Sequence, residues 1–284
     1  MHDNGLMSYY RNLKNKQGYL KAGDAGFKFT TDKSYQEYMK TPSGIYFAKR
    51  GQKDKIDAEI LLSQIYKNAG FVSPTYMPVL NSLGARMVVS EDIKTPTSVE
   101  ALSVVEKIKD ANPTTLNPHF NLFSEKVGVK TLEEHFTPEV LTQMIDMYGF
   151  DVASKNYDRN LLNFFLSKTE QDGKVDGLQV FDYGQSGCAY TGIVSGIQDE
   201  SKIPYRNLFA SGADRNAGSM LNQLKTNPVV LSYETPSALA EKIGSVDVVA
   251  TAQDVKQSIG YEINPGYVDF VASSFDKFAN DLVK

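Results

Sequence analysis

The most informative part of the sequence is residues 156–163, which read Asn-Tyr-Asp-Arg-Asn-Leu-Leu-Asn, together with residues 181–184, which read Phe-Asp-Tyr-Gly. In the first stretch Asp158 is followed five residues later by Asn163. In the second, Asp182 precedes an aromatic residue and a glycine. Apolar segments lead into both stretches, and a carboxylate beside a buried segment is costly unless it meets a metal ion or a cation. Asp158 and Asp182 are therefore candidates for catalytic or metal-binding roles.

This order of side chains is typical of phosphoryl transfer to a hydroxyl group. In the kinase arrangement, the first acid accepts the proton of the attacking hydroxyl, while the amide and the second acid hold Mg²⁺ on the phosphates of ATP. The pattern predicts Asp158 as the catalytic base, and Asn163 and Asp182 as the metal ligands. Polar loop residues taken alone more often cap helices and form turns, so the prediction also needs the other parts of a kinase.

The segment between the two stretches predicts a β-hairpin. Apolar residues begin a strand at residue 164, and a second strand runs into Phe181. Gly173 and Gly177 mark the turn region between them. We expect this hairpin to bring Asn163 and Asp182 to the same end of the paired strands, as two ligands of one metal site require.

The first ninety or so residues predict strands around one helix. Short runs rich in aromatic and β-branched residues indicate strands at residues 18–21, 26–30, 44–49, 76–80 and 86–90. Residues 52–69 repeat apolar side chains at helical spacing, and Gly70 then ends the helix. Asp54 and Asp57 have the spacing of a capping box at its start.

After residue 91 the pattern becomes mostly helical. Thr137, Pro138 and Glu139 provide a cap residue, a proline at the first helical position and an early acid, so a helix should begin there. Its apolar spacing continues to Val152, which indicates a core helix leading to the loop at residue 156. Further helical patterns occur near residues 237–243, 251–259 and 265–284.

These elements predict an α+β fold of two lobes. Residues 1–92 form the predicted N-terminal lobe, rich in strands with one helix, and residues 93–284 form the mostly helical C-terminal lobe. The hinge is expected near residues 90–93, where Glu91 and Ile93 would contact the nucleotide.

Other parts of a kinase can be placed in the N-terminal lobe. A kinase needs a lysine on an inner strand, braced by a helix carboxylate, to bind the phosphates of ATP. Lys49 ends the third predicted strand, and Glu59 lies in the helix ten residues later. Gly23 and Gly26 lie between the first two strands, where a glycine-rich loop would cover the phosphates, although an ordinary hairpin turn fits them equally well. The chain has no Walker sequence, which argues against a P-loop enzyme.

Composition bounds the remaining possibilities. The 284 residues are 41% hydrophobic and 23% charged, with a formal net charge of -4, so no basic stripe indicates nucleic acid. No apolar run is long enough to span a bilayer, and the N-terminus lacks the pattern of a secretory signal. One cysteine, Cys188, allows no internal disulfide, and three histidines do not indicate a zinc site. We therefore expect a cytoplasmic protein, with non-classical secretion as an effector as the open alternative.

The catalytic stretches resemble those of the HipA-type kinases, and especially the CtkA-like secreted bacterial kinases, which are similar in turn to the phosphoinositide kinases. The resemblance also includes residues 48–49, 58–63 and 68–71, and covers roughly residues 45–187. It departs from the family at Asn160, where histidine is common, and at Leu162, where glycine is usual. The loop is therefore expected to be held differently.

This resemblance implies an α+β, bilobal protein-kinase-like fold, and ATP- and Mg²⁺-dependent phosphorylation of serine or threonine, often including autophosphorylation. It implies that Lys49 contacts the ATP phosphates and that Glu59 braces it. It also implies that Asp158 is the base, with Asn163 and Asp182 as the magnesium ligands. The protein substrate is not indicated by the sequence.

Two alternatives remain open. A lipid or small-molecule kinase could use the same fold, although the acidic charge balance argues mildly against a membrane-facing lipid kinase. A kinase-like module could instead bind a nucleotide without turnover. The presence of the lysine and both acids favours an active enzyme.

Overall fold

The computed structural model describes residues 20–21, 28–31, 37–41, 44–81, 84–111, 122–157, 159, 163–169, 173–184, 186 and 217–284. Several residues named above lie outside this set: Gly23, Gly26, Asp158, Asn160, Leu162 and Cys188. None of the helices formed by the described residues combines the length and hydropathy needed to cross a membrane.

The N-terminal part is built on a six-stranded sheet with the strand order β1-β5-β6-β4-β3-β2. The strands are β1 (Leu20–Lys21), β2 (Lys28–Thr31), β3 (Glu37–Thr41), β4 (Gly44–Arg50), β5 (Tyr76–Leu80) and β6 (Arg86–Ser90). β1 pairs with β5 in parallel, and the other pairs are antiparallel. Five of these strands were predicted from sequence; β3, with the sequence Glu-Tyr-Met-Lys-Thr, was not.

One helix, α2 (Lys53–Asn68), packs against β5 and β6. The helix was predicted correctly, but the capping box was wrong. Gln52 is the N-cap and makes no side-chain capping bond. Asp57 is instead fully buried and accepts hydrogen bonds from the Tyr261 hydroxyl at 2.6 Å and the Asn264 amide at 3.1 Å. It therefore connects α2 to the C-terminal end of the chain.

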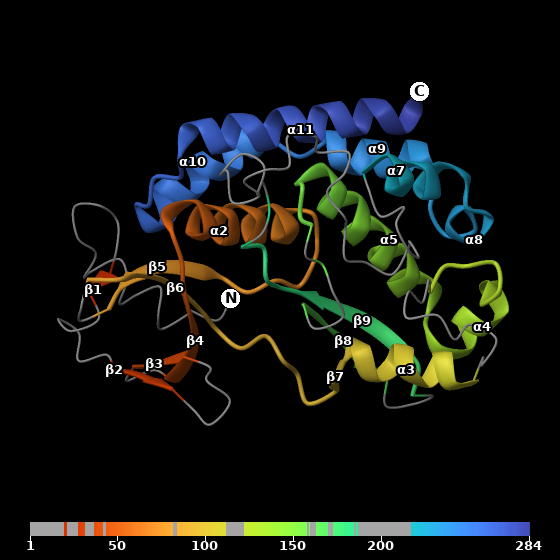
Figure 1. Ribbon diagram of the computed structural model, residues 1–284, viewed down its shortest axis with the longest axis horizontal. Helices are drawn as coiled ribbons and strands as arrows, with labels where there is room; N and C mark the ends of the chain where they lie inside the picture. The colour runs from red at the N-terminus through yellow and green to blue at the C-terminus, as the bar shows by residue number, and fades with distance from the viewer. Residues whose placement is uncertain are drawn as a thin grey trace.

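The remaining residues form a three-stranded sheet surrounded by helices (Figure 1). The strands are β7 (Ser98–Glu100), β8 (Phe164–Lys168) and β9 (Val175–Val180), in the order β7-β8-β9. The helices are α3 (Ala101–Ala111), α4 (Gly128–His135), α5 (Pro138–Ala153), α7 (Ala217–Thr226), α8 (Pro228–Leu231), α9 (Pro236–Gly244), α10 (Val248–Ile259) and α11 (Pro265–Val283). The long helix α11 lies along one side of the molecule, over α9, and α10 contacts α2 (Figure 1).

Helix α5 forms the centre of this part, as predicted. Thr137 caps it by accepting a hydrogen bond from the Val140 amide, and proline occupies its first turn. The helix contacts β9, α7, α9 and α11, and most of its residues are buried. It ends at Ala153, just before the motif loop at residue 156.

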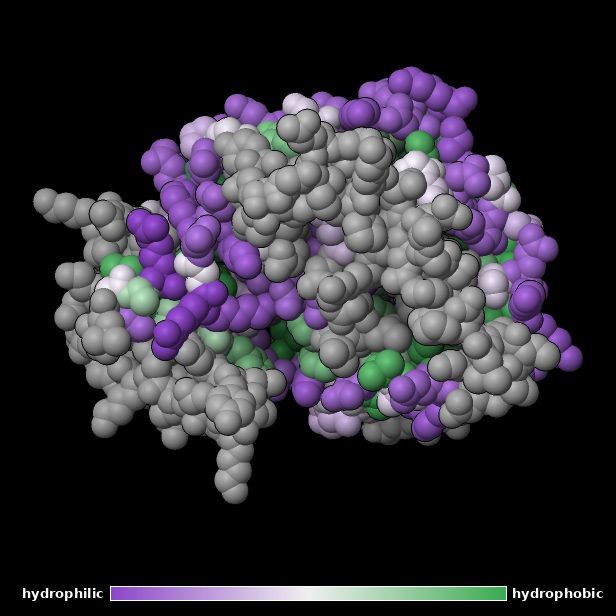
Figure 2. Space-filling view, viewed as in Figure 1, coloured by the Kyte–Doolittle hydropathy of each residue, from purple (hydrophilic) through white to green (hydrophobic). Residues whose placement is uncertain are grey.

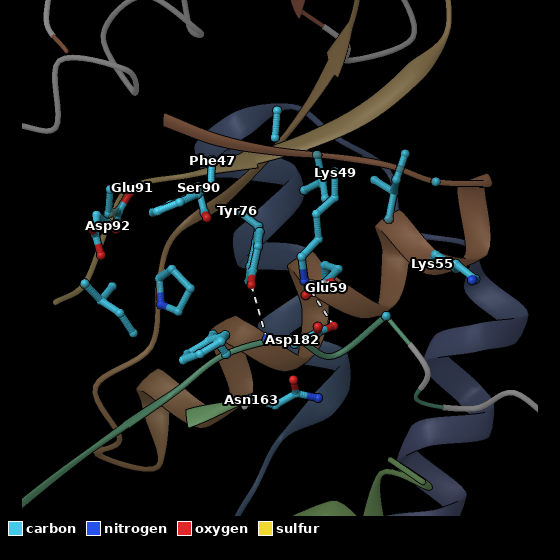
Figure 3. A pocket seen from close by; sticks show the side chains of 18 of the residues that line it. Phe47, Lys49, Lys55, Glu59, Tyr76, Ser90, Glu91, Asp92, Asn163 and Asp182 are labelled. Carbon is cyan, nitrogen blue, oxygen red and sulfur yellow. Dashed lines mark hydrogen bonds and ion pairs between the residues drawn. The ribbon is translucent and has the colours of Figure 1, made fainter. Parts of the chain in front are cut away.

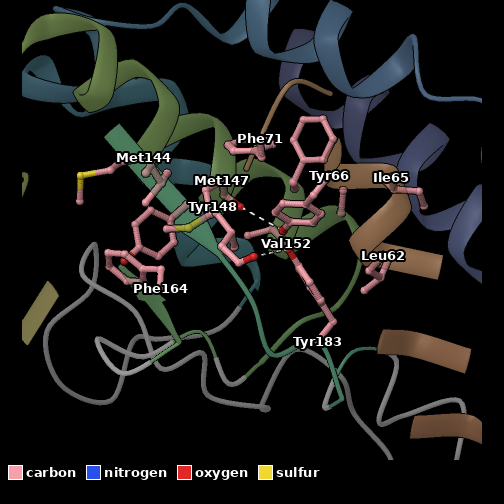
Figure 4. Packing of buried hydrophobic residues seen from close by; sticks show 14 of the residues in the cluster. Leu62, Ile65, Tyr66, Phe71, Met144, Met147, Tyr148, Val152, Phe164 and Tyr183 are labelled. Carbon is pink, nitrogen blue, oxygen red and sulfur yellow. Dashed lines mark hydrogen bonds between the residues drawn. The ribbon is translucent and has the colours of Figure 1, made fainter. Parts of the chain in front are cut away.

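An aromatic cluster joins the two parts of the molecule (Figure 4). Tyr66 of α2 lies 5.4 Å from Phe150 of α5 and 4.9 Å from Tyr183, measured between ring centroids. Phe71 packs on both Tyr66 and Phe150. Because such pairs add to the burial of apolar area, the helix that carries Glu59 is held directly against the C-terminal core. The division of the chain at residue 92 remains a prediction.

The face shown in Figure 2 is mostly hydrophilic where α10 and α11 are visible. Among the described residues, few large apolar side chains are exposed, and these are Val72, Leu231, Val249 and Val283.

Two buried carboxylates share one lysine beneath α9. Lys242 donates to both oxygens of Asp146, at 3.0 and 2.8 Å, and also to Glu234. Burial raises the pKa of Asp146 to about 6, an effect that Lys242 opposes and the neighbouring Glu234 carboxylate reinforces. The proton of Asp146 is therefore held more tightly in the folded state than in the unfolded one.

We expect Asp146→Asn to change the pH dependence of stability. The folded pKa of Asp146 lies above its ordinary value of 3.8, so this group stabilises the fold below about pH 4 and loses that contribution as the pH rises to about 6. The free energy of unfolding of the variant minus that of the wild type should increase by about 2–3 kcal/mol over this window. Urea unfolding at pH 4, 5, 6 and 7 measures the difference. Parallel curves for the two proteins would contradict the assignment.

Candidate active site

Three charged side chains from three different elements of the fold meet at one point (Figure 3). The Lys49 Nζ lies 3.0 Å from Glu59 Oε1 and 3.0 Å from Asp182 Oδ1. Lys49 comes from β4, Glu59 from α2, and Asp182 follows β9. The lysine predicted to bind phosphate is therefore paired both with the predicted helix carboxylate and with a predicted metal ligand.

The pKa values of this cluster favour a charged lysine and a charged aspartate. Burial acts to lower the pKa of Lys49, but the Glu59 and Asp182 carboxylates outweigh it and hold that pKa above its ordinary value. Burial acts to raise the pKa of Asp182, but the Lys49 ammonium leaves it below its ordinary value. Burial also raises the pKa of Glu59, against the effect of Lys49. Near neutral pH, Lys49 is thus a cation that can meet phosphate, and Asp182 is an anion that can meet a metal ion.

The hairpin of β8 and β9 places Asn163 next to the Asp182 segment. Phe164 pairs with Val180, and the Phe181 amide donates to the Asn163 carbonyl at 3.2 Å. The Asn163 and Asp182 side chains line the same cavity, as the predicted hairpin requires (Figure 3). Asn163 is buried, whereas 36% of the Asp182 side chain is exposed to the cavity and solvent.

The donor set fits a magnesium ion carried by phosphates. Carboxylate and amide oxygens are the ligands that Mg²⁺ prefers, and one or two of them suffice because phosphates and waters complete its shell. Asn163 and Asp182 supply such oxygens at one end of the cavity. Within the part of the chain that the structure describes, no group of three or more His, Cys, Asp or Glu residues could hold a metal ion by protein ligands alone.

The backbone around Asp182 is held from several sides. Its φ angle is +65°, in the left-handed region that residues other than glycine rarely adopt. The next amide, of Tyr183, donates to Glu59 Oε2 at 2.9 Å, so Glu59 holds both Lys49 and this segment. A Cβ atom at Gly184 would lie 3.1 Å from Glu59 Oε1, which explains why a glycine suits this position.

A buried ion pair anchors the loop that leads to the site. The Arg159 side chain is 1% exposed and that of Asp151 is 2% exposed. Arg159 Nε lies 2.9 Å from Asp151 Oδ2, and Nη2 lies 3.1 Å from Oδ1. Arg159 Nη1 donates to the carbonyls of Asn163, at 2.9 Å, and Phe181. One guanidinium group thus fixes the backbone beside both predicted metal ligands.

Sequence analysis missed the role of this pair. Both residues stand in or next to the quoted motif, but a charged residue near a loop is usually solvated. The signal that could have found Asp151 is its position near the end of α5, a helix whose apolar residues leave few solvent-facing positions. The Asp151 carboxylate also accepts hydrogen bonds from the Tyr66 hydroxyl at 2.7 Å and from the Asn156 side-chain amide at 2.9 Å.

A cavity of about 890 Å³ extends from the charged cluster to the predicted hinge. Glu91 and Ile93 line it, as do the aromatic residues Phe165 and Phe181, whose rings lie 4.7 Å apart. The Glu91 side chain accepts a hydrogen bond from the Thr75 amide at 2.8 Å, so it also has a structural role. The volume is within the range of pockets that bind small molecules and cofactors.

The structure brings together six of the residues predicted for the site. The cavity is lined by Lys49, Glu59, Glu91, Ile93, Asn163 and Asp182. The predicted base, Asp158, and the predicted loop glycines, Gly23 and Gly26, lie outside the described residues. Tyr76 of β5, which also lines the cavity, was not singled out from the sequence.

Comparisons with known proteins identify the fold. No family model matches the chain. No curated protein sequence matches it. Among solved structures, the proinflammatory kinase CtkA of Helicobacter pylori is 13% identical with a TM-score of 0.60, over 93% of this chain and 94% of that one. HipA of Shewanella oneidensis MR-1, solved with HipB and operator DNA, is 10% identical with a TM-score of 0.53, over 90% of this chain and 63% of that one. The chain therefore has the kinase-like fold of CtkA and HipA, which confirms the fold class predicted from the motifs.

Proposed function

We propose that the protein is an ATP- and Mg²⁺-dependent phosphotransferase, and specifically a serine/threonine protein kinase that can phosphorylate itself. The observation that carries this proposal is the position of Lys49, which lies 3.0 Å from both Glu59 and Asp182 at the end of the cavity. That arrangement joins the phosphate-binding and metal-binding residues of a kinase, and it occurs in the fold shared with CtkA and HipA.

Each residue of the site has a separate role in phosphoryl transfer. Lys49 binds the α- and β-phosphates, and Glu59 keeps its ammonium pointing into the cavity. Asn163 and Asp182 would hold Mg²⁺, which would neutralise negative charge on the phosphates. Asp158 accepts the proton of the attacking hydroxyl, and the hinge side of the cavity, with Phe165 and Phe181, holds the base of the nucleotide. Phosphoryl transfer requires little covalent chemistry from the protein. The placement of these side chains around the nucleotide therefore accounts for most of the expected rate enhancement.

Labelling with γ-³²P-ATP and Mg²⁺ tests the proposal. We expect the wild-type protein to transfer label to itself and to a basic protein substrate such as myelin basic protein. Lys49→Met and Asp158→Asn should each lower this rate by at least about 100-fold, because one loses the phosphate-binding charge and the other loses the base. Phosphoamino-acid analysis should find the label on serine or threonine.

Other outcomes would separate the alternatives. Label in a lipid extract or a small-molecule mixture, with none on protein, would favour a lipid or small-molecule kinase of the same fold. A nucleotide-dependent rise in melting temperature without turnover would favour a non-catalytic nucleotide-binding module. Equal labelling by wild type and Lys49→Met would show that this lysine does not bind the phosphates.

A further inference from the structure

Tyr76 joins the metal-binding segment to the N-terminal sheet. It is the first residue of β5 and is 5% exposed, and its ring lines the back of the cavity. Its hydroxyl accepts a hydrogen bond from the Asp182 amide at 3.3 Å (Figure 3). The Tyr76 hydroxyl thus lies in the N-terminal part of the molecule, and the Asp182 amide that it binds lies in the C-terminal part.

The Tyr76 hydroxyl binds the amide of Asp182, which is the one described aspartate whose φ angle is positive. Such a backbone conformation is unfavourable and persists only where surrounding contacts determine it. On one side of Asp182, Arg159 binds the carbonyl of Phe181; on the other, Glu59 binds the amide of Tyr183. The bond from Tyr76 is made to the amide of Asp182 itself. The Phe181 carbonyl and the Asp182 amide belong to one peptide group, so loss of the Tyr76 bond would leave that group held at its carbonyl by Arg159 but no longer at its amide, next to the Asp182 carboxylate.

The ring of Tyr76 has a separate structural role. It meets the ring of Tyr183 edge to face, with the centroids 6.4 Å apart. Burial raises the pKa of Tyr76 well above its ordinary value, so the hydroxyl remains neutral and keeps its proton at working pH. Phenylalanine preserves the ring contact and removes only the acceptor. The substitution therefore isolates the hydrogen bond to Asp182.

We propose that Tyr76 is a positioning residue for metal binding, whose hydroxyl orients Asp182 so that its carboxylate and Asn163 can hold a phosphate-bound Mg²⁺ together. The proposal rests on the proposed function and deepens it at the same site. It assigns to Tyr76 no contact with the nucleotide and no proton transfer. Its effect is expected in the affinity for the metal–nucleotide complex, because that affinity depends on the direction of the Asp182 side chain.

Tyr76→Phe tests the proposal with two measurements. The first is the Mg²⁺ concentration that gives half-maximal phosphoryl transfer at saturating ATP, which should rise by about three- to tenfold. The second is the calorimetric affinity for a non-hydrolysable ATP analogue, measured with and without Mg²⁺. We expect the affinity with Mg²⁺ to fall by a similar factor, and the affinity without metal to stay within about twofold of wild type.

Tyr233→Phe is the matched control. The Tyr233 hydroxyl makes hydrogen bonds at 3.4 Å to the Val129 carbonyl and to Glu133, both in α4 and outside the cavity. Its removal should leave both measurements unchanged. The melting temperature of each variant shows whether the fold is preserved.

The possible results are distinguishable. If Tyr76→Phe changes neither the Mg²⁺ requirement nor the affinity for the magnesium–analogue complex, the positioning role is wrong while the proposed function stands. An equal loss of affinity with and without Mg²⁺ would also overturn the role, because it would indicate general damage to the cavity. A wild-type protein that neither binds the analogue with Mg²⁺ nor transfers phosphate would overturn the proposed function, and this inference with it.

Discussion

Replacing Asp182 by asparagine is expected to lower the rate of phosphoryl transfer by at least about 100-fold while leaving the fold intact. The amide has the same shape as the carboxylate but lacks the charge that would bind Mg²⁺ and that pairs with Lys49 at 3.0 Å. Because the Asp182 side chain is 36% exposed, the lost ion pair should change the free energy of unfolding by no more than about 1 kcal/mol. Initial rates of ³²P transfer and chemical denaturation measure the two effects.

Asp176→Asn is the matched control for this experiment. Asp176 lies in β9, on the same hairpin, and is exposed to solvent. The same change from carboxylate to amide there should leave the rate and the stability at wild-type values. A rate for Asp182→Asn within about tenfold of wild type would rule out Asp182 as a principal metal ligand.

Replacing Arg159 by methionine is expected to destabilise the protein by about 3–5 kcal/mol. The substitution leaves the Asp151 carboxylate, which is 2% exposed, without its cation. It also removes the donor that binds the carbonyls of Asn163 and Phe181. Removing one partner of a buried ion pair is more damaging than removing both, because the remaining charge stays in a medium of low polarity. Urea unfolding at pH 7 measures the loss.

The double variant Asp151→Asn with Arg159→Met separates the ion pair from the packing. Asparagine removes the isolated charge and retains an oxygen that can accept from Tyr66. The double variant should therefore be more stable than Arg159→Met alone. Lys256→Met is a control, because its pair with Glu262 is exposed to solvent and should contribute little to stability. A loss for Arg159→Met no larger than for this control would contradict the anchoring role.

Local pattern was enough to predict most of the elements. The cap and proline at Thr137 and Pro138 begin α5 as expected, and apolar spacing predicted α2 within a residue at each end. Strands β5 and β6 match the predicted ranges. Such signals are carried by neighbouring residues, so they can be recognised before any long-range contact is known. Strand β3 was not predicted, and in the structure it pairs with β2 and β4.

The candidate site was predictable where the order of residues along the chain determines which of them lie close together. The spacing of Asn163 and Asp182 indicated a hairpin, and the register of β8 and β9 brings the two segments together. The order of Lys49 and Glu59 indicated an ion pair, which is present at 3.0 Å. The roles assigned to these residues, and to Asp158 outside the described residues, remain predictions.

The fold class and the candidate catalytic residues could be predicted from the sequence alone, because strand and helix periodicity and motif spacing are local properties. Only the tertiary structure decided how those residues are held. The Tyr76 hydroxyl meets the Asp182 amide across 106 positions of sequence, and Asp57 meets Tyr261 across 204. No local pattern specifies such partners, since they depend on which buried polar groups remain to be satisfied once the helices and sheets have packed.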